Sequence, residues 1–293
     1  MEYISNEEYR AREGVSSSVL KKLLISDAHL QYVVDNGWQK TEATTLGDAI
    51  HAYFLEPERF DSMYITEVDT YKKAYNGFAA GDAKLDEYGK PIVVLKHTTD
   101  SKMDIKGEQY RKFQYMVSAI KDCPEAMVML KNKEYVEASF FDSYNNIPIK
   151  VRCDFMYRDP ENRLWVVDIK SVGGTKERPS DAKNFSRVMF EFGYDLQEYM
   201  YFEVIKKYIP EVYGFKFLCV DAKCPSGVKI YDIVPSESDW HELGGYRFKL
   251  AMDRYKKFKA RDIHPVYERV TETINLSFDA ADKLVQLREV YGE

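Results

Sequence analysis

The chain has 293 residues and a formal net charge of −6, and 45% of its residues are hydrophobic, which is enough for a sizeable buried core. It contains no apolar run of the roughly 20 residues that a membrane-spanning helix needs, and residues 1–5 lack the pattern of a secretory signal peptide. We therefore expect a cytoplasmic protein without a membrane partner. The four cysteines have neither C-x-x-C pairs nor zinc-site spacing, so we expect neither a disulfide scaffold nor a metal–thiolate site.

Helices are expected to make up most of residues 1–132. Their predicted ranges are 16–36, 44–56, 100–121 and 124–132. The first two ranges begin with a serine and a threonine, which are good N-cap residues, and Pro57 is expected to end the second helix. Residues 68–90 have no clear periodicity and contain several glycines, which predicts a mobile loop or lid near the functional site.

Strands are expected from residue 133 to residue 234. Their predicted ranges are 134–142, 147–157, 163–170, 214–222 and 227–234. Asn145 and Asn146 are a turn signal between the first two strands, and helices over 180–191 and 193–208 are expected to connect the third strand to the fourth. This order predicts a mixed α/β fold with a central mixed sheet flanked by helices.

The last part of the chain is predicted to be a long helix from Pro235 to about Lys259, followed by a tail. No internal repeat, low-complexity segment or linker divides the chain. We therefore expect one domain over residues 1–293. Its parts would be the helical region 1–132, the sheet core 133–234, and the helix and tail 235–293.

The motif with the clearest chemistry is Asp-x-Lys at the end of an apolar run, residues 166–170 (Val-Val-Asp-Ile-Lys). In a strand, the period of two puts Asp168 and Lys170 on the same face. A carboxylate can hold Mg²⁺, while an ammonium can orient the attacking water and offset charge on a scissile phosphate. Asp154, on the strand-like segment before the turn at 159–162, would bring a second carboxylate to the same end of the sheet.

An isolated Asp-x-Lys usually marks only a solvated strand end, so the order of further residues matters. Along the chain come Gly47 to His51, Glu137, Asp154, Asp168 to Lys170, and Gln197-x-x-x-Tyr201. In this arrangement the chain resembles the PD-(D/E)xK nuclease superfamily, which has a restriction-endonuclease-like core. Within it, the chain resembles the exonuclease VIII-type phage recombination nucleases, which are related to lambda-type exonucleases. One departure is that Cys153 stands where the superfamily label has proline.

The resemblance extends over most of the chain. Residues 15–21 and 26–29 look like the family's opening helix, and residues 45–60 look like its histidine helix. The roles that it implies are metal binding for His51, Asp154, Asp168 and the Ile169 carbonyl, catalysis for Lys170, support for Glu137, and orientation of DNA or of the lysine for Gln197 and Tyr201.

Each of these residues also has a structural explanation. His51 could be a packed helix residue, and Glu137 could be the polar face of a half-buried strand. Gln197 and Tyr201 are four positions apart, so they share a helix face that could simply be core. The implied cofactor is Mg²⁺, with Mn²⁺ as a substitute. Imidazole suits Mn²⁺ better than Mg²⁺, so His51 could contact the ion through a bound water.

The resemblance implies a Mg²⁺-dependent double-stranded DNA exonuclease that works 5′ to 3′ and leaves 3′ single-stranded tails. Its implied partners are DNA ends, a single-strand annealing protein and further copies of the chain in a trimeric or tetrameric ring. It also implies a phage or prophage origin and action in the bacterial cytoplasm. Two alternatives remain open: a structure- or sequence-specific endonuclease of the same fold, and a catalytically inactive DNA-binding assembly protein.

The net negative charge is unfavourable for binding a polyanion, so local basic segments must supply the phosphate contacts. The densest basic run is 254–261, which could equally be a solvated helix face. Lys176 and Arg178, just after the Asp168 strand, are better placed for DNA, and Lys21 and Lys22 are further candidates. The cysteines are not clustered, which excludes the iron–sulfur branch of the superfamily.

Overall fold

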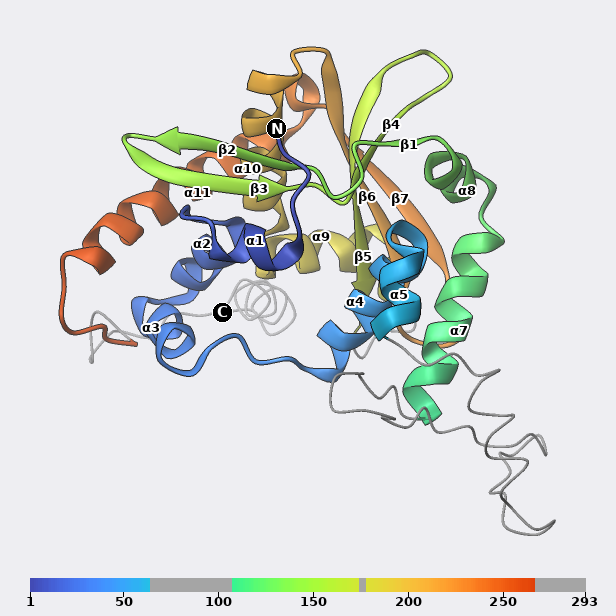
Figure 1. Ribbon diagram of the computed structural model, residues 1–293, viewed down its shortest axis with the longest axis horizontal. Helices are drawn as coiled ribbons and strands as arrows, with labels where there is room; N and C mark the ends of the chain where they lie inside the picture. The colour runs from blue at the N-terminus through green and yellow to red at the C-terminus, as the bar shows by residue number, and fades with distance from the viewer. Residues whose placement is uncertain (64–106, 174–177, 267–293) are drawn as a thin grey trace, which may run out of the picture.

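The computed structural model describes residues 1–63, 107–173 and 178–266 (Figure 1). The predicted lid at 68–90, the first part of the predicted helix 100–121 and most of the predicted tail lie outside the described residues. Within the described ranges, no helix is both long and apolar enough to cross a membrane.

A five-stranded mixed sheet forms the centre of the structure. In spatial order its strands are β1 (Lys133–Glu134), β4 (Phe155–Arg158), β5 (Leu164–Val172), β6 (Val212–Asp221) and β7 (Val228–Ile233). β5 and β6 are parallel, whereas all other neighbours are antiparallel. Parallel strands need a long crossover connection, which α9 (Ala182–Glu191) and α10 (Tyr194–Tyr208) supply. The predicted mixed α/β fold is confirmed.

A separate two-stranded hairpin extends away from this sheet (Figure 1). Its strands are β2 (Ser139–Tyr144) and β3 (Ile147–Arg152). Asn145 and Asn146 form the two-residue turn with φ values of 49° and 64°. Asparagine tolerates positive φ better than most residues, so the predicted turn follows from local chemistry and is confirmed.

The predictions of continuous strands over 134–142 and 147–157 are wrong. Each segment divides between the main sheet and the hairpin. The first breaks at Tyr135 and Glu137, whose φ values are 49° and 52°, and the second breaks around Asp154. The two segments stay hydrogen-bonded through the break, with Glu137 N 2.9 Å from Asp154 O. The alternation of polar and apolar residues therefore continues and hides the change of direction.

Five helices precede the sheet core: α1 (Asn6–Ala11), α2 (Ser17–Ile25), α3 (Asp27–Asn36), α4 (Glu42–Leu55) and α5 (Pro57–Met63). The single helix predicted over 16–36 is wrong, because Ser26 is extended and its side chain accepts a hydrogen bond from His29 N to cap α3. Pro57 does not only end α4; it also begins α5, since its fixed φ suits a first helical turn.

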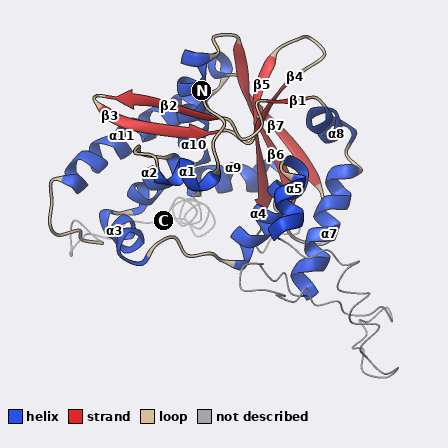
Figure 2. Ribbon diagram, in the orientation of Figure 1, coloured by secondary structure: helices blue, strands red, loops and turns tan. Residues whose placement is uncertain are grey.

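Helices lie on both faces of the sheet (Figure 2), and a hydrophobic core fills the space on each face. Leu164 and Val166 of β5 face the first core with α2, α9, α10 and α11 (Asp239–Lys259), which follows a short 3₁₀ turn, η1 (Pro235–Glu237). Trp165 and Val167 face the second core with α4, α7 (Gly107–Lys121) and α8 (Pro124–Lys131). Both faces are covered, so polar side chains of β5 are desolvated wherever they point.

Candidate active site

Strands β4 and β5 bring two carboxylates together. Phe155 pairs with Val167 across these antiparallel strands, so Asp154 and Asp168 are neighbours at the end of this pairing. Asp154 Oδ2 accepts a hydrogen bond from Ile169 N at 2.7 Å. The predicted approach of the two carboxylates is therefore present, although Asp154 lies in the junction before β4 and not inside a strand.

Helix α4 brings His51 to the same place. Nε2 of His51 lies 2.9 Å from the carbonyl oxygen of Ile169, and Nδ1 lies 3.5 Å from Asp154 Oδ2. A carbonyl can only accept, so Nε2 carries the proton and Nδ1 is left to face the carboxylate. Gly47 permits this close packing, because a Cβ there would lie 3.2 Å from Ser171 Oγ on β5.

Glu137 reaches the site through the irregular segment between β1 and β2. Its φ of 52° turns the chain out of strand geometry, so the expectation that it lies on a strand is wrong. Arg152 Nε donates to its carboxylate at 2.6 Å. One ligand atom from each of His51, Glu137 and Asp154 lies within 4.8 Å of the others. These three residues are called the metal group below.

Asp168, Lys170 and Gln197 form a second cluster, called the lysine group below. Asp168 and Lys170 share a face of β5, as the period of two predicts, and the lysine ammonium forms an ion pair with Asp168 Oδ2. Gln197 Nε2 donates to Asp168 Oδ1 at 2.6 Å, while Lys170 Nζ lies 3.4 Å from Gln197 Oε1. The carboxylate of Asp168 is thus committed to this cluster and is not part of the metal group.

The donor atoms of the metal group suit a divalent cation. They comprise carboxylate oxygens and one imidazole nitrogen, and the Ile169 carbonyl beside His51 has a second lone pair. Carboxylate and carbonyl oxygens are the usual ligands of Mg²⁺, and imidazole also suits Mn²⁺. A metal-binding histidine commonly donates its other ring N–H to a backbone carbonyl, as His51 does here. The residues present fit a divalent metal site.

Electrostatics at the metal group favour binding of a cation. Burial, and then the nearby carboxylates of Asp168 and Glu137, raise the pKa of Asp154 to about 7, although His51 opposes this. Burial lowers the pKa of His51, but Asp154, Asp168 and the Ile169 carbonyl raise that pKa by more. A shared proton or a metal ion would relieve the repulsion between these carboxylates.

The structure does not bring Tyr201 into either group. Its side chain is partly buried and hydrogen-bonded to Ser17 of α2, and desolvation raises its pKa well above the usual value. Its ring packs 6.4 Å from that of Phe215. Of the expected glutamine–tyrosine pair, only Gln197 touches the lysine group, and Tyr201 connects α10 to α2.

Two further residues at the lysine group were not predicted as site residues. The Tyr194 ring lies 4.6 Å from Lys170 Nζ, measured to the ring centroid. Lys21 of α2 donates to Gln197 Oε1 and lies 4.8 Å from the same ring. The sequence predicts Lys21 only as a phosphate contact, because nothing in it indicates which side chains pack together across a separation of 176 positions.

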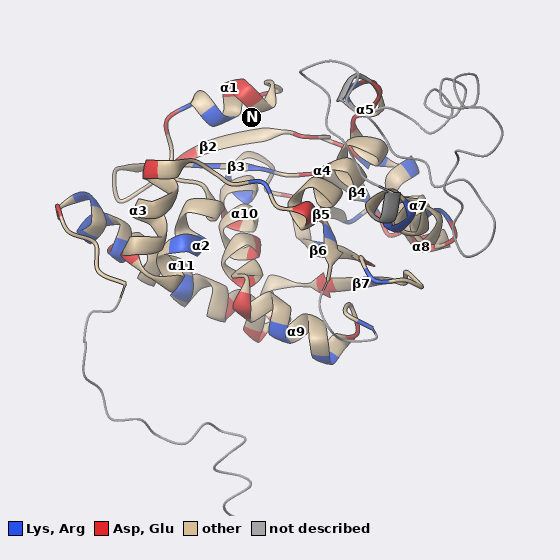
Figure 3. Ribbon diagram, turned by 90° about the horizontal axis from the view of Figure 1, so that it is seen from below, with Lys and Arg blue, Asp and Glu red and all other residues tan. Residues whose placement is uncertain are grey.

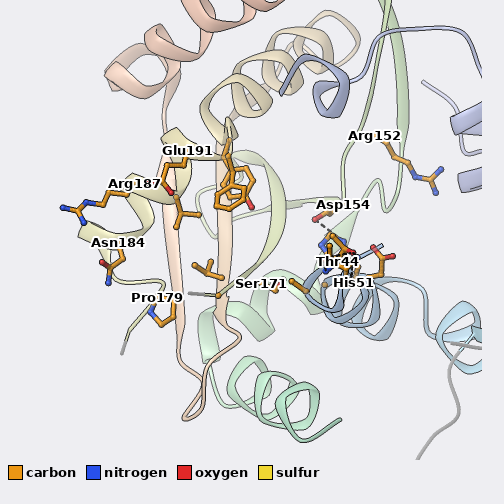
Figure 4. Close-up of a pocket in the computed structure, with 18 of the residues that line it drawn as sticks. Thr44, His51, Arg152, Asp154, Ser171, Pro179, Asn184, Arg187 and Glu191 are labelled. Carbon is orange, nitrogen blue, oxygen red and sulfur yellow. Dashed lines mark hydrogen bonds and ion pairs between the residues drawn. The ribbon is translucent and has the colours of Figure 1, made fainter. Parts of the chain in front are cut away.

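A cavity of about 1000 Å³ opens beside the metal group. His51, Asp154 and Glu137 are part of its lining, together with Arg59, Arg152 and Arg187. Figure 4 shows Asn184, Arg187 and Glu191 of α9 on one side of the cavity, with His51 and Asp154 on the other. The lining thus combines three arginines, which can contact phosphates, with carboxylates, which can hold a cation.

Elsewhere, basic and acidic residues are interspersed over the helices (Figure 3). Arg254, which begins the densest basic run, donates to the carbonyl oxygens of Leu23 and Leu24 at 2.7 and 3.2 Å. It therefore has a structural role at the end of α2. Lys176 lies outside the described residues.

Solved structures show the fold to which this arrangement belongs. A protein from Eubacterium rectale, described as a "putative exonuclease", matches with a TM-score of 0.59 and 14% sequence identity, over 95% of this chain and 98% of that chain. The match shows a shared fold. The structure of SSO0001 has a TM-score of 0.29 and 13% identity over 51% of this chain and 68% of that chain, a similarity too low to indicate a shared fold.

No curated protein matches the chain. A family model described as "PDDEXK-like domain of unknown function (DUF3799)" matches residues 16–276, which include every member of the metal and lysine groups. The expected PD-(D/E)xK nuclease fold is confirmed, whereas the narrower exonuclease VIII type stays a prediction. The chain belongs to the DUF3799 family of PDDEXK-like domains.

Proposed function

We propose that this protein is a divalent-metal-dependent exodeoxyribonuclease that digests one strand of a linear DNA duplex. The observation that carries the proposal is the meeting of the metal group and the lysine group at the end of the β4–β5 pairing, with the metal group opening into a cavity whose lining includes three arginines. Carboxylates that can hold a cation and a lysine held beside them are what metal-assisted phosphodiester hydrolysis needs.

His51, Glu137 and Asp154 of the metal group, together with the Ile169 carbonyl, would hold the metal ion. When bound, a divalent ion supplies positive charge that offsets the charge of the scissile phosphate. Lys170 adds a fixed ammonium that orients the attacking water, and Asp168 and Gln197 hold this ammonium in place. Arg152 holds Glu137 at the edge of the metal group. Arg59 and Arg187 can contact the DNA backbone along the cavity wall.

The finer features of the proposal come from the resemblance to exonuclease VIII-type nucleases. They are Mg²⁺ as the natural ion, 5′ to 3′ polarity, and 3′ single-stranded tails that an annealing protein uses in recombination. A ring of three or four copies in the cytoplasm of a bacterial host completes the proposal. Mass photometry gives a direct test of the ring, because a species of only 34.3 kDa would contradict it.

The nuclease proposal is tested with a linear duplex labelled separately at each 5′ and 3′ end, beside a covalently closed circle, with Mg²⁺ or Mn²⁺. We expect digestion of the linear DNA alone, from its 5′ ends. Lys170→Met should lower the rate by at least about 100-fold, the usual cost of removing one preorganised charge-stabilising group.

Lys216→Met is the matched control. Lys216 is also a buried strand lysine, but it pairs with Asp232 and lies 3.8 Å from the Trp165 ring in the second core. Cleavage of the circle would instead support an endonuclease. Binding of DNA without cleavage in either metal would support a DNA-binding assembly protein.

A further inference from the structure

A second lysine, Lys21 of α2, lies against the lysine group. Lys21 donates a hydrogen bond to Gln197 Oε1, the same oxygen that Lys170 Nζ approaches at 3.4 Å. The two ammonium groups also flank one ring, at 4.8 and 4.6 Å from the Tyr194 centroid. Lys21 and Lys170 thus share two partners.

Burying the Lys21 ammonium beside Lys170 costs folding free energy. Lys170 has Asp168 as an ion-pair partner, but within the described part of the chain no carboxylate forms an ion pair with Lys21. Burial, and then the charge of Lys170, lower the pKa of Lys21 to about 7. A cation that is desolvated beside a like charge costs folding free energy, and a role in the site would account for its presence.

The backbone around Lys21 holds it in this position. Gly193, with a φ of 65°, begins α10, and a Cβ there would lie 3.1 Å from Lys21 Cγ and 3.3 Å from Leu24 Cδ1. The guanidinium of Arg254 holds the C-terminal end of α2 through its hydrogen bonds to two carbonyl oxygens. The side chain of Lys21 therefore reaches Gln197 from a helix fixed on both sides.

The contacts of Gln197 agree on one orientation of its amide. An amide has one acceptor oxygen and two donor hydrogens; an ammonium only donates, and a carboxylate only accepts. With Oε1 toward the lysines, Nε2 donates to Asp168 Oδ1 at 2.6 Å. If the amide were reversed, its N–H groups would face the ammonium of Lys21 and its oxygen would face Asp168.

We propose that Lys21 is a positioning residue of the nuclease site, which fixes the Gln197 amide so that Gln197 holds Asp168 and Lys170. This inference rests on the proposed nuclease function, because that is the activity that Lys21 would affect; the contacts of Lys21 with Gln197 do not depend on it. Lys21 acts through Gln197, so it should affect catalysis and leave DNA affinity largely unchanged.

A double-mutant cycle tests this role, using Lys21→Met, Gln197→Met and the double variant on the labelled linear duplex. We expect Lys21→Met to lower kcat about 10- to 100-fold, as small misplacements of catalytic groups do, with little change in KM. If Lys21 works through Gln197, the double variant should match Gln197→Met within about twofold. Lys21→Arg, which keeps a charged donor, should recover part of the activity.

Lys206→Met is the control, because Lys206 lies on α10, the helix of Gln197, and is 5.1 Å from the Phe202 ring instead of against the lysine group. A kcat of Lys21→Met within about twofold of wild type would overturn the inference and leave the nuclease proposal intact. The inference would also be overturned if the rate losses of Lys21→Met and Gln197→Met multiplied in the double variant. A change in KM alone would overturn it too, because it would indicate that Lys21 contacts DNA directly.

A second measurement needs no activity and keeps the inference testable if the wild type cuts nothing. The side-chain amide of Gln197 can be assigned in a ¹H–¹⁵N spectrum by its loss in Gln197→Met. Lys21→Met should shift this signal and speed its hydrogen exchange, whereas Lys206→Met should leave it in place. An unchanged signal in Lys21→Met would contradict the positioning role.

Discussion

His51 and His241 each lie near two acidic side chains, and His51 also lines the cavity beside the metal group. His241 Nδ1 is 3.0 Å from Glu198 Oε1, and Nε2 is 3.6 Å from Glu203 Oε1, between α10 and α11. Glu198 is fully buried, and the histidine neutralises it. His51 instead uses Nε2 for a backbone carbonyl and leaves the carboxylates of the metal group in excess.

The difference lies in charge balance and not in residue type. Hydrogen bonds to Glu198 and Glu203 raise the pKa of His241 to about 9 despite its burial, so an ion pair forms at neutral pH. At the metal group, burial and neighbouring carboxylates raise the pKa of Asp154 to about 7, so charge remains to be compensated. A satisfied histidine–carboxylate pair supports the fold, while an unsatisfied group beside a cavity is suited to bind a ligand.

The largest expected effect comes from Asp154→Asn. It should lower the nuclease rate by roughly 1000-fold, about 4 kcal/mol of activation free energy. It should not lower the melting temperature, because it removes a desolvated charge from a crowded acidic group and keeps an acceptor for Ile169 N. Single-turnover cleavage and thermal unfolding check the two parts. A large loss of stability would mean that the metal group supports the fold as the His241 cluster does.

For His241→Ala we expect a loss of stability without a loss of nuclease activity. Removing the histidine leaves the buried Glu198 charge unpaired, which should cost about 3 kcal/mol of unfolding free energy. Cleavage measured well below the melting temperature should stay close to wild type, because His241 touches no residue of the metal or lysine groups. Urea unfolding measures the loss. Glu203→Gln is the control, and since Glu203 is 45% exposed, it should cost less than about 1 kcal/mol.

The stabilisation that a bound metal ion gives should depend on pH through Asp154 of the metal group. The folded-state pKa of Asp154 is raised from 3.8 to about 7, so its contribution to stability is present below pH 3.8 and lost as the pH rises through about 7. Bound Mn²⁺ or Mg²⁺ should restore it, and the metal-induced gain in unfolding free energy should grow between pH 6 and 8, by at most about 1.4 kcal/mol per pH unit. Thermal unfolding with and without Mn²⁺ measures this gain, which Asp154→Asn should remove.

The smallest effect is the pH dependence of the His241 pair. The pKa of His241 is raised from 6.5 to about 9, so its stabilisation is complete below pH 6.5 and is lost as the pH rises through about 9. The raised pKa of Glu198, caused by burial, acts in the same direction. Urea unfolding from pH 6 to 10 should show a decline in the wild type that is weaker in His241→Ala. Parallel curves would indicate that the pair is not ionised in the folded protein.

Sequence patterns within a few residues correctly predicted the features that depend on local backbone geometry. The period of two placed Asp168 and Lys170 on one face, and two asparagines marked the hairpin turn. The same patterns did not reveal the break at Ser26, because the apolar spacing of α2 and α3 continues through it. They also did not reveal the left-handed backbone at Glu137, since its neighbours still alternate as in a strand.

The sequence by itself determined the mixed α/β fold, the Asp-x-Lys strand and the residues whose order resembles a PD-(D/E)xK nuclease. The fold and the strand depend on periodicity and on turn chemistry within a few residues, whereas the resemblance depends on the order of the motif residues along the chain. Only the tertiary structure decided that Glu137 joins His51, that Tyr201 bonds to Ser17 and that Lys21 meets Gln197. Such contacts join residues far apart in the chain, and they depend on how the helices pack against the sheet, which no local pattern encodes.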